Sequence, residues 1–142
     1  MTTTQNPTKL FRVISIFALL WNAIGAFQFF VEMSMTEETL SSYPQDIQNF
    51  MHNIPSWFTY AFGIAVFGGF IGSLGLVLLK NWSVILMQIS FFAVFAMTFY
   101  DFFIQNDVAM TVAFSTMPIV VFSISLFLLI FSRRAKFKGY LN

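Results

Sequence analysis

Long apolar runs dominate the chain, and short polar segments separate them. Residues 13–31, 57–79, 82–104 and 108–132 form four runs, and each is long enough to cross a hydrocarbon core, which needs about 20 helical residues. Only residues 80–81 and 105–107 connect the last three runs, and connections this short make consecutive helices antiparallel neighbours. The pattern predicts an all-α membrane protein with a single domain over residues 1–142, an antiparallel bundle of four transmembrane helices.

The longer connection, residues 32–56, carries a helical pattern of its own. Ser41 or Ser42 followed by Pro44 is typical of a helix start. Apolar residues then recur at helical spacing, namely Ile47, Phe50, Met51 and Ile54. We therefore predict a short amphipathic external helix on the membrane surface, which acts either as an interfacial anchor or as a lid over the bundle mouth. His52 lies on or beside it and is interpreted as a solvated surface histidine.

Composition supports the membrane assignment. Charged residues make up 9% of the chain, whereas soluble domains average about 25%. A cleaved signal peptide is the competing interpretation of the first run, since Lys9 and Arg12 precede it. The run is too long for a signal peptide, contains Asn22 at its centre and lacks a small-residue cleavage site. We therefore interpret it as a spanning helix.

The charges are segregated along the chain. All seven basic residues fall at one set of helix ends: Lys9, Arg12, Lys80, Arg133, Arg134, Lys136 and Lys138. All six acidic residues fall at the other: Glu32, Glu37, Glu38, Asp46, Asp101 and Asp107. Because cytoplasmic loops collect Lys and Arg, both termini are predicted to be cytoplasmic. The basic cluster after the last run is interpreted as an anchor on anionic lipid head groups, in preference to a tail that docks on nucleic acid or on a partner protein.

Several kinds of chemistry are excluded by composition. The chain has no cysteine, so it cannot pass electrons through paired thiols. Its single histidine cannot supply two axial haem ligands or a multi-histidine metal centre. The eight methionines are scattered and are interpreted as adaptable packing residues. We expect no cofactor, no metal and no enzymatic activity.

Five of the seven glycines lie in the second run: Gly63, Gly68, Gly69, Gly72 and Gly75. In lipid, small residues spaced four apart let helix backbones approach closely. This pattern predicts that the second run is the central packing helix, with phenylalanines from its neighbours against the glycine face. Two alternatives are a homodimer interface and a glycine-lined groove for a lipid tail or small ligand.

Polar residues inside the spans suggest a binding site, because such residues are costly in lipid. Asn22, Gln28 and Glu32 fall on one arc of the first run. Similar outer depth is predicted for Thr98, Asp101, Thr111 and Ser115, and Pro118 can kink the last helix. The hypothesis is an outward-facing polar cavity; the alternative is that these groups bond to one another and bind nothing. No acidic residue lies at the bilayer centre, which disfavours proton-driven export.

Several stretches resemble a known family: "LLWNAIGAFQFF", "MSMTEETLSSYPQ", "IPSWFTYAFGIAVFGGFIGSLGLVLLK" and "RRAKFKGYLN". They are similar to small bacterial membrane proteins with four spans, which often carry a "sugar transporter" label. The resemblance covers nearly the whole chain. It implies the same four-span fold, a location in the bacterial cytoplasmic (inner) membrane and a solute-transport role. It implies no site residues.

Three functions follow as hypotheses. The protein binds or transports a small solute or lipid, in which case four helices would need a homodimer to enclose a path. Alternatively, it is a structural or accessory subunit of a larger membrane complex. An intramembrane enzyme is the least supported, because Glu32, His52 and Asp101 would have to converge at the outer surface. Membrane lipids are expected partners in every case, and nucleic acid is not.

Overall fold

The computed structural model describes residues 5–103 and 112–142, and these contain helices and no strand. Four helices are long and apolar enough to cross a membrane: α1 (Lys9–Met33), α4 (Ser56–Val77), α5 (Trp82–Phe103) and α6 (Val112–Phe137). Two short helices, α2 (Glu37–Ser41) and α3 (Gln45–Asn53), lie between α1 and α4. The expected all-α class with four spans is confirmed.

The described span boundaries agree with the hydropathy pattern to within two residues except at two ends. Helix α1 begins at Lys9, four residues before the predicted start at residue 13. Helix α6 continues five residues past the predicted boundary at residue 132, through two arginines and a lysine, to Phe137. Within this extension Ala135 is buried, so the charged turn is held by packing that hydropathy does not detect. The predicted start of this span, residues 108–111, lies outside the described residues. Pro118 lies inside α6, which continues through it.

The connection between α1 and α4 is more helical than predicted. The amphipathic helix exists as α3, and its apolar residues Ile47, Phe50 and Met51 are partly buried. The predicted start at Ser41 or Ser42 is wrong, because these serines end α2, and Pro44 occupies the position before α3. Helix α2 was not predicted. Its start depends on Thr36, whose hydroxyl accepts a hydrogen bond from the Thr39 amide at 3.3 Å.

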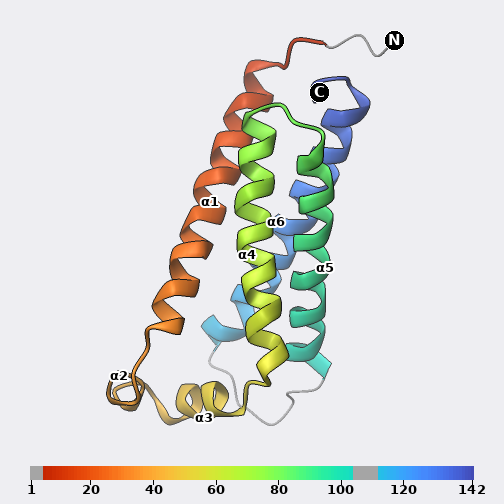
Figure 1. Ribbon diagram of the computed structural model, residues 1–142. Helices are drawn as coiled ribbons and strands as arrows, with labels where there is room; N and C mark the ends of the chain where they lie inside the picture. The colour runs from red at the N-terminus through yellow and green to blue at the C-terminus, as the bar shows by residue number, and fades with distance from the viewer. Residues whose placement is uncertain (1–4, 104–111) are drawn as a thin grey trace.

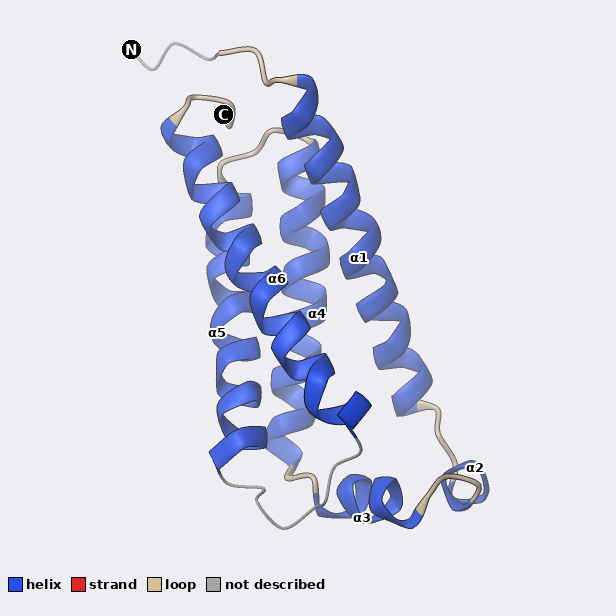
Figure 2. Cartoon of the chain, turned by 180° about the vertical axis from the view of Figure 1, so that it is seen from behind, coloured by secondary structure: helices blue, strands red, loops and turns tan. Residues whose placement is uncertain are grey.

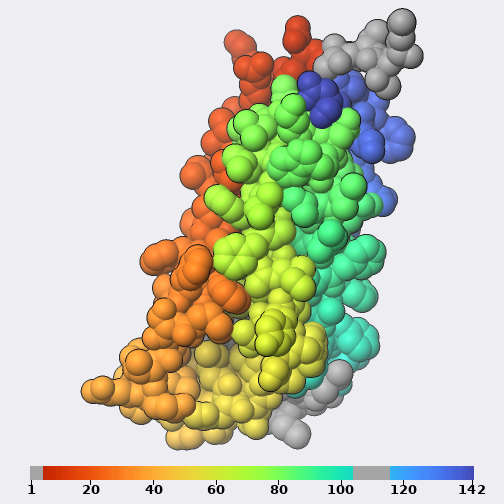
Figure 3. Space-filling model, in the orientation of Figure 1, coloured from red at the N-terminus to blue at the C-terminus, as the bar shows by residue number. Residues whose placement is uncertain are grey.

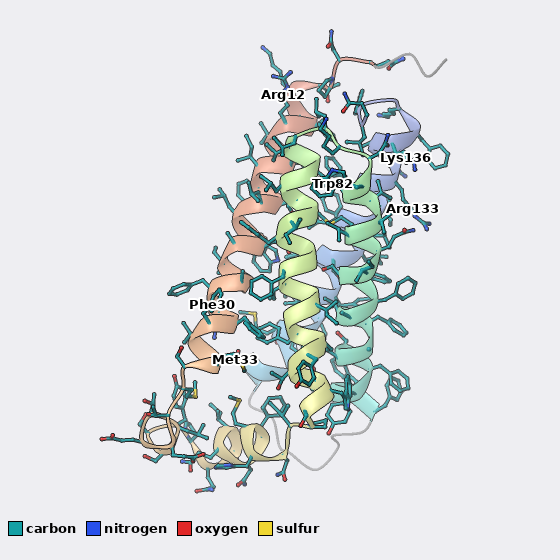
Figure 4. All side chains as sticks on the ribbon, viewed as in Figure 1. Arg12, Phe30, Met33, Trp82, Arg133 and Lys136 are labelled. Carbon is teal, nitrogen blue, oxygen red and sulfur yellow. The ribbon has the colours of Figure 1, made fainter. Side chains whose placement is uncertain are left out.

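The four long helices run antiparallel in chain order (Figure 1). The chain termini and the α4–α5 turn lie at one end of the bundle, which we call the terminal end, and α2 and α3 lie at the other, which we call the α3 end. Arg12, Arg133 and Lys136 all lie toward the terminal end, whereas Met33 marks the α3 end of α1 (Figure 4). The charge segregation in the sequence is therefore a separation along the bundle axis.

The helices pack as a row more than as a closed square. Helix α4 contacts α1 and α5, and α6 packs on α5. Figure 3 shows the side chains of α1, α4 and α5 side by side along one face. Viewed from behind, the ribbons of α5 and α6 diverge toward the α3 end (Figure 2). The hydrophobic core, which includes Phe11, Leu76, Met87, Leu128 and Tyr140, belongs to the terminal half.

The last residues of the chain fasten the terminal end. The Asn142 amide donates to the Leu79 carbonyl at 2.7 Å, and the Asn81 amide donates to the Asn142 carbonyl at 3.0 Å. Gly139 has φ 71°, which allows the chain to reverse after α6. The Tyr140 ring then lies edge-on to Phe11 at 5.4 Å, which links α6 to α1. This clasp closes the row of helices at the terminal end.

Candidate functional site

A small polar layer lies at the centre of α1, α4 and α5. Asn22 Nδ2 donates to the Ala18 carbonyl at 2.9 Å and to Ser73 Oγ at 3.0 Å. From the other side of α4, Ser90 Oγ donates to the Ala65 carbonyl at 2.6 Å. Asn22 and Ser90 each donate a hydrogen bond to α4 from a neighbouring helix. For Asn22, this is the interhelical bond that the alternative to the polar cavity describes. Asn22 is therefore part of a filled contact between α1 and α4.

The glycines of α4 lie against these and neighbouring side chains. A Cβ added at Gly69 would lie 3.0 Å from Asn22 Cγ and 3.2 Å from Ser90 Oγ. The other glycines meet Phe29 (Gly63), Ser90 and Leu86 (Gly68), Met87 and Leu86 (Gly72), and Trp82 and Ser83 (Gly75). Only Gly63 has a phenylalanine ring against it, so the expectation of a phenylalanine-covered glycine face is wrong. Polar and flexible side chains occupy most of that face.

The remaining polar residues of α1 do not converge on Asn22. Gln28 is exposed, and Glu32 is partly buried. The side chains of Gln28 and Glu32 interact with each other one turn apart on α1. The predicted polar face of α1 is thus divided between a buried contact at the centre and a local pair near the α3 end.

An apolar groove of about 360 Å³ opens between α5 and α6. Its walls are Phe95, Thr98, Phe99, Phe102, Phe103 and Phe122. Of the predicted site residues whose side chains are described, Thr98 alone lines it. Thr111 and Ser115 lie outside the part of the chain whose side chains the structure describes. The described lining of the groove is therefore aromatic, and the outward-facing polar cavity, which includes Thr111 and Ser115, stays a prediction.

The groove phenylalanines had no sequence signal that set them apart. The chain contains 21 phenylalanines. In a membrane helix, a phenylalanine is as well suited to face lipid as to line a groove. A signal is present only in retrospect: Phe95, Phe99, Phe102 and Phe103 recur at i, i+4, i+7 and i+8 on α5. Rings of Phe95 and Phe122 lie 6.3 Å apart, so α6 supplies the facing wall.

Asp101 lies at the end of the buried seam of α5. Ser83, Met87, Ser90 and Val94 are buried at alternating spacings of four and three, and Met97 and Asp101 continue the series. Asp101 is partly buried. Its Oδ1 is enclosed and has no hydrogen-bond partner, the one such side-chain atom among the described residues. Since α5 runs antiparallel to α4 and the neighbouring Tyr100 ring contacts Trp57 at 5.2 Å, Asp101 is level with the first turn of α4.

His52 is engaged elsewhere. Its Nε2 lies 3.8 Å from Glu37 Oε2, which joins α3 to α2 through an exposed pair. His52 is thus paired with Glu37. The enzyme hypothesis requires His52 to converge with Glu32 and Asp101 instead. Within residues 5–103 and 112–142, no three His, Asp or Glu side chains come together in a way that could hold a metal ion.

Comparison with known proteins adds no family or relative. No protein-family model matches the chain, and neither the curated proteins nor the solved structures contain a match.

Proposed function

We propose that the protein binds a lipid or another apolar amphiphile from the surrounding membrane in the groove between α5 and α6. The supporting observation is the groove itself, whose volume of about 360 Å³ falls in the range of small-molecule sites, ~300–1,000 Å³. Five of its six lining residues are phenylalanines. Flat aromatic walls suit a hydrocarbon chain, because they offer dispersion contacts without polar groups that need partners.

The same lining argues against a sugar as the ligand. A sugar presents many hydroxyl groups, and each needs a hydrogen-bond partner when it leaves water. Among the described residues, Thr98 is the single polar residue that lines the groove. We therefore propose binding of an apolar ligand in place of the solute transport that the family resemblance implies. The proposal does not include passage of that ligand between the leaflets.

The proposal includes an orientation. The seven basic residues at the terminal end support a cytoplasmic location of that end in a bacterial cell, because cytoplasmic loops collect Lys and Arg. The α3 end then faces outward, so that α3, with its apolar residues partly buried, rests on the outer surface. Phe99, Phe102 and Phe103 lie in the last turns of α5, toward the α3 end. In the proposed orientation, this part of the groove would lie at the depth of the outer leaflet.

Photolabelling tests the binding site. The full chain is reconstituted with a phospholipid that carries a diazirine on its acyl chain, illuminated and mapped by peptide mass spectrometry. Phe99 is 49% exposed, and Tyr60 on α4, at similar depth, is 74% exposed. A bound chain labels Phe99 more strongly than Tyr60, and excess unlabelled lipid reduces the Phe99 labelling alone. Labelling that simply follows exposure would show that the groove holds no preferred ligand.

A second candidate function is that of a structural or accessory subunit of a larger membrane complex. The observation in its favour is the filled centre, where Asn22, Gly69, Ser73 and Ser90 leave no path between α1, α4 and α5. Gentle extraction followed by mass spectrometry tests it, because an accessory subunit would co-purify with other subunits in a fixed ratio.

A further inference from the structure

We infer that the groove ligand carries a neutral, planar conjugated ring with an oxygen substituent, as in a long-chain phenol or quinone. This inference rests on the proposed function and specifies the chemical class of the ligand. Three properties of the groove support it: a lining without charge, one hydroxyl group without a partner, and phenylalanine rings that are stacked on one another.

The first step concerns charge and size. The described residues that line the groove are five phenylalanines and Thr98, and none of them is charged. A charged group inside the groove would lose its hydration without gaining an ion pair, at a high cost, so the part of the ligand that enters is neutral. An apolar cavity of about 150 Å³ is large enough to hold benzene. A groove of about 360 Å³ therefore has room for one ring and the first part of an alkyl tail.

The second step concerns Thr98, which lines the groove from α5. Its hydroxyl makes no hydrogen bond within the described part of the structure. The described serine hydroxyls of α5 and α6, by contrast, each donate to a backbone carbonyl: Ser83, Ser90, Ser123, Ser125 and Ser132. A hydroxyl without a partner is costly in lipid. An oxygen atom on the ligand would supply the partner, because a threonine hydroxyl both donates and accepts.

The third step concerns the phenylalanine rings of α5. The rings of Phe99 and Phe103 lie 4.7 Å apart and 25° from parallel, which is an offset-stacked arrangement. Phe95 continues the series, with its ring 6.5 Å from that of Phe99 and 26° from parallel. Rings that cover one another's faces present their edges to the groove. Ring edges carry partial positive charge and pair favourably with the negative face of a conjugated ring, whereas a saturated ring offers them dispersion alone.

Binding of three probes to the full chain in nanodiscs tests the inference, with uptake by empty nanodiscs subtracted. The probes are 4-nonylphenol, 4-nonylcyclohexanol, which has a saturated ring in place of the conjugated one, and nonylbenzene, which lacks the oxygen. We expect wild type to bind 4-nonylphenol about fivefold more tightly than 4-nonylcyclohexanol, as an edge-to-face contact would give. It should also bind 4-nonylphenol about fivefold more tightly than nonylbenzene, as one neutral hydrogen bond would give.

Thr98→Val provides the comparison for the oxygen, because valine has nearly the shape of threonine and no hydroxyl. It should lower the affinity for 4-nonylphenol to that for nonylbenzene and leave nonylbenzene binding unchanged. Thr98→Ser keeps the hydroxyl and should keep the preference for the phenol. If wild type and Thr98→Val prefer 4-nonylphenol over nonylbenzene to the same extent, Thr98 does not recognise the ligand and the inference is wrong.

Phe99→Leu provides the comparison for the ring. It should reduce the preference for 4-nonylphenol over 4-nonylcyclohexanol to within about twofold. The control is Phe92→Leu, the same change at a phenylalanine of α5 that is 66% exposed and is not among the groove residues, which should keep the preference. If wild type lacks either preference, the inference is wrong and the groove proposal stands. If wild type binds none of the three probes, the proposed function itself fails.

Discussion

At the scale of single residues, the contact between α1 and α4 depends on what lies opposite each glycine. Asn22 occupies the space that a side chain at Gly69 would need, and its amide bonds to Ser73. The ring of Phe29 lies opposite Gly63 at 3.4 Å from an added Cβ, which is ordinary contact. The two positions look alike in the sequence, yet they have different tolerance for a methyl group.

Gly69→Ala should therefore destabilise the fold, and Gly63→Ala should not. The added methyl group at Gly69 meets Asn22 and Ser90, and overpacking of this kind costs about 1–3 kcal/mol. At Gly63 the higher helix propensity of alanine should leave stability equal or improved by up to about 1 kcal/mol. Unfolding of both variants by sodium dodecyl sulfate, followed by circular dichroism, measures the difference. Equal stability of the two variants would contradict this account of the contact.

At single positions, the sequence predicted which residues take part in helix packing. It did not predict which side chains contact each other. The spacing of small residues marked α4 as a helix to examine, and Asn22 as a polar group that needs a partner. Which side chain meets which glycine depends on the relative rotation of the helices, and that is set by long-range packing. Asp101 could be named as a site residue from the cost of charge in lipid, whereas its unpartnered oxygen is a property of the folded bundle.

At the scale of elements, hydropathy located the four spans and missed the structures that depend on backbone hydrogen bonds. The clasp at the end of the chain is the clearest example. Its contacts are amide-to-carbonyl bonds between Asn142, Asn81 and Leu79, and no side-chain pattern marks such bonds apart from Gly139. The basic cluster beside the clasp was interpreted as a lipid anchor, and nothing in its composition indicates that the residues after it fold back on the bundle.

Tyr140→Ala should loosen this clasp. Tyr140 is buried and its ring packs on Phe11, so removal of the ring leaves a cavity and costs up to about 3 kcal/mol locally. Hydrogen exchange of the Asn81 and Asn142 amides should become faster, because both are held by the clasp. Tyr140→Phe keeps the ring and serves as the control with unchanged exchange. Slow exchange in Tyr140→Ala would show that the backbone bonds hold without the ring.

At the scale of the whole molecule, the separation of charge along the bundle predicts how the chain lies in the membrane. The basic residues gather at the terminal end and the described acidic residues at the α3 end. The sequence was sufficient for this prediction because the charge of each connection is read directly from the chain. The groove could not be predicted from the sequence, because its walls come from two helices whose mutual rotation the sequence does not specify.

Single-cysteine labelling tests this orientation, and the absence of native cysteine makes the experiment simple. Asn49 on α3 and Asn142 at the terminal end are both exposed, and Asn→Cys changes no charge at either position. A membrane-impermeant maleimide added to intact cells should label Asn49→Cys fully and Asn142→Cys only after permeabilisation. The reverse pattern would place the terminal end outside.

The central claim is that the groove between α5 and α6 holds an apolar ligand, and native mass spectrometry of gently extracted protein tests it most directly. Wild type is compared with Thr98→Trp, which fills the groove, and with Ile89→Trp, which places the same bulk at an exposed position of α5 outside the groove. We expect one retained apolar molecule per chain in wild type and Ile89→Trp, and its loss in Thr98→Trp. Equal retention in all three proteins, or none in wild type, would contradict the account.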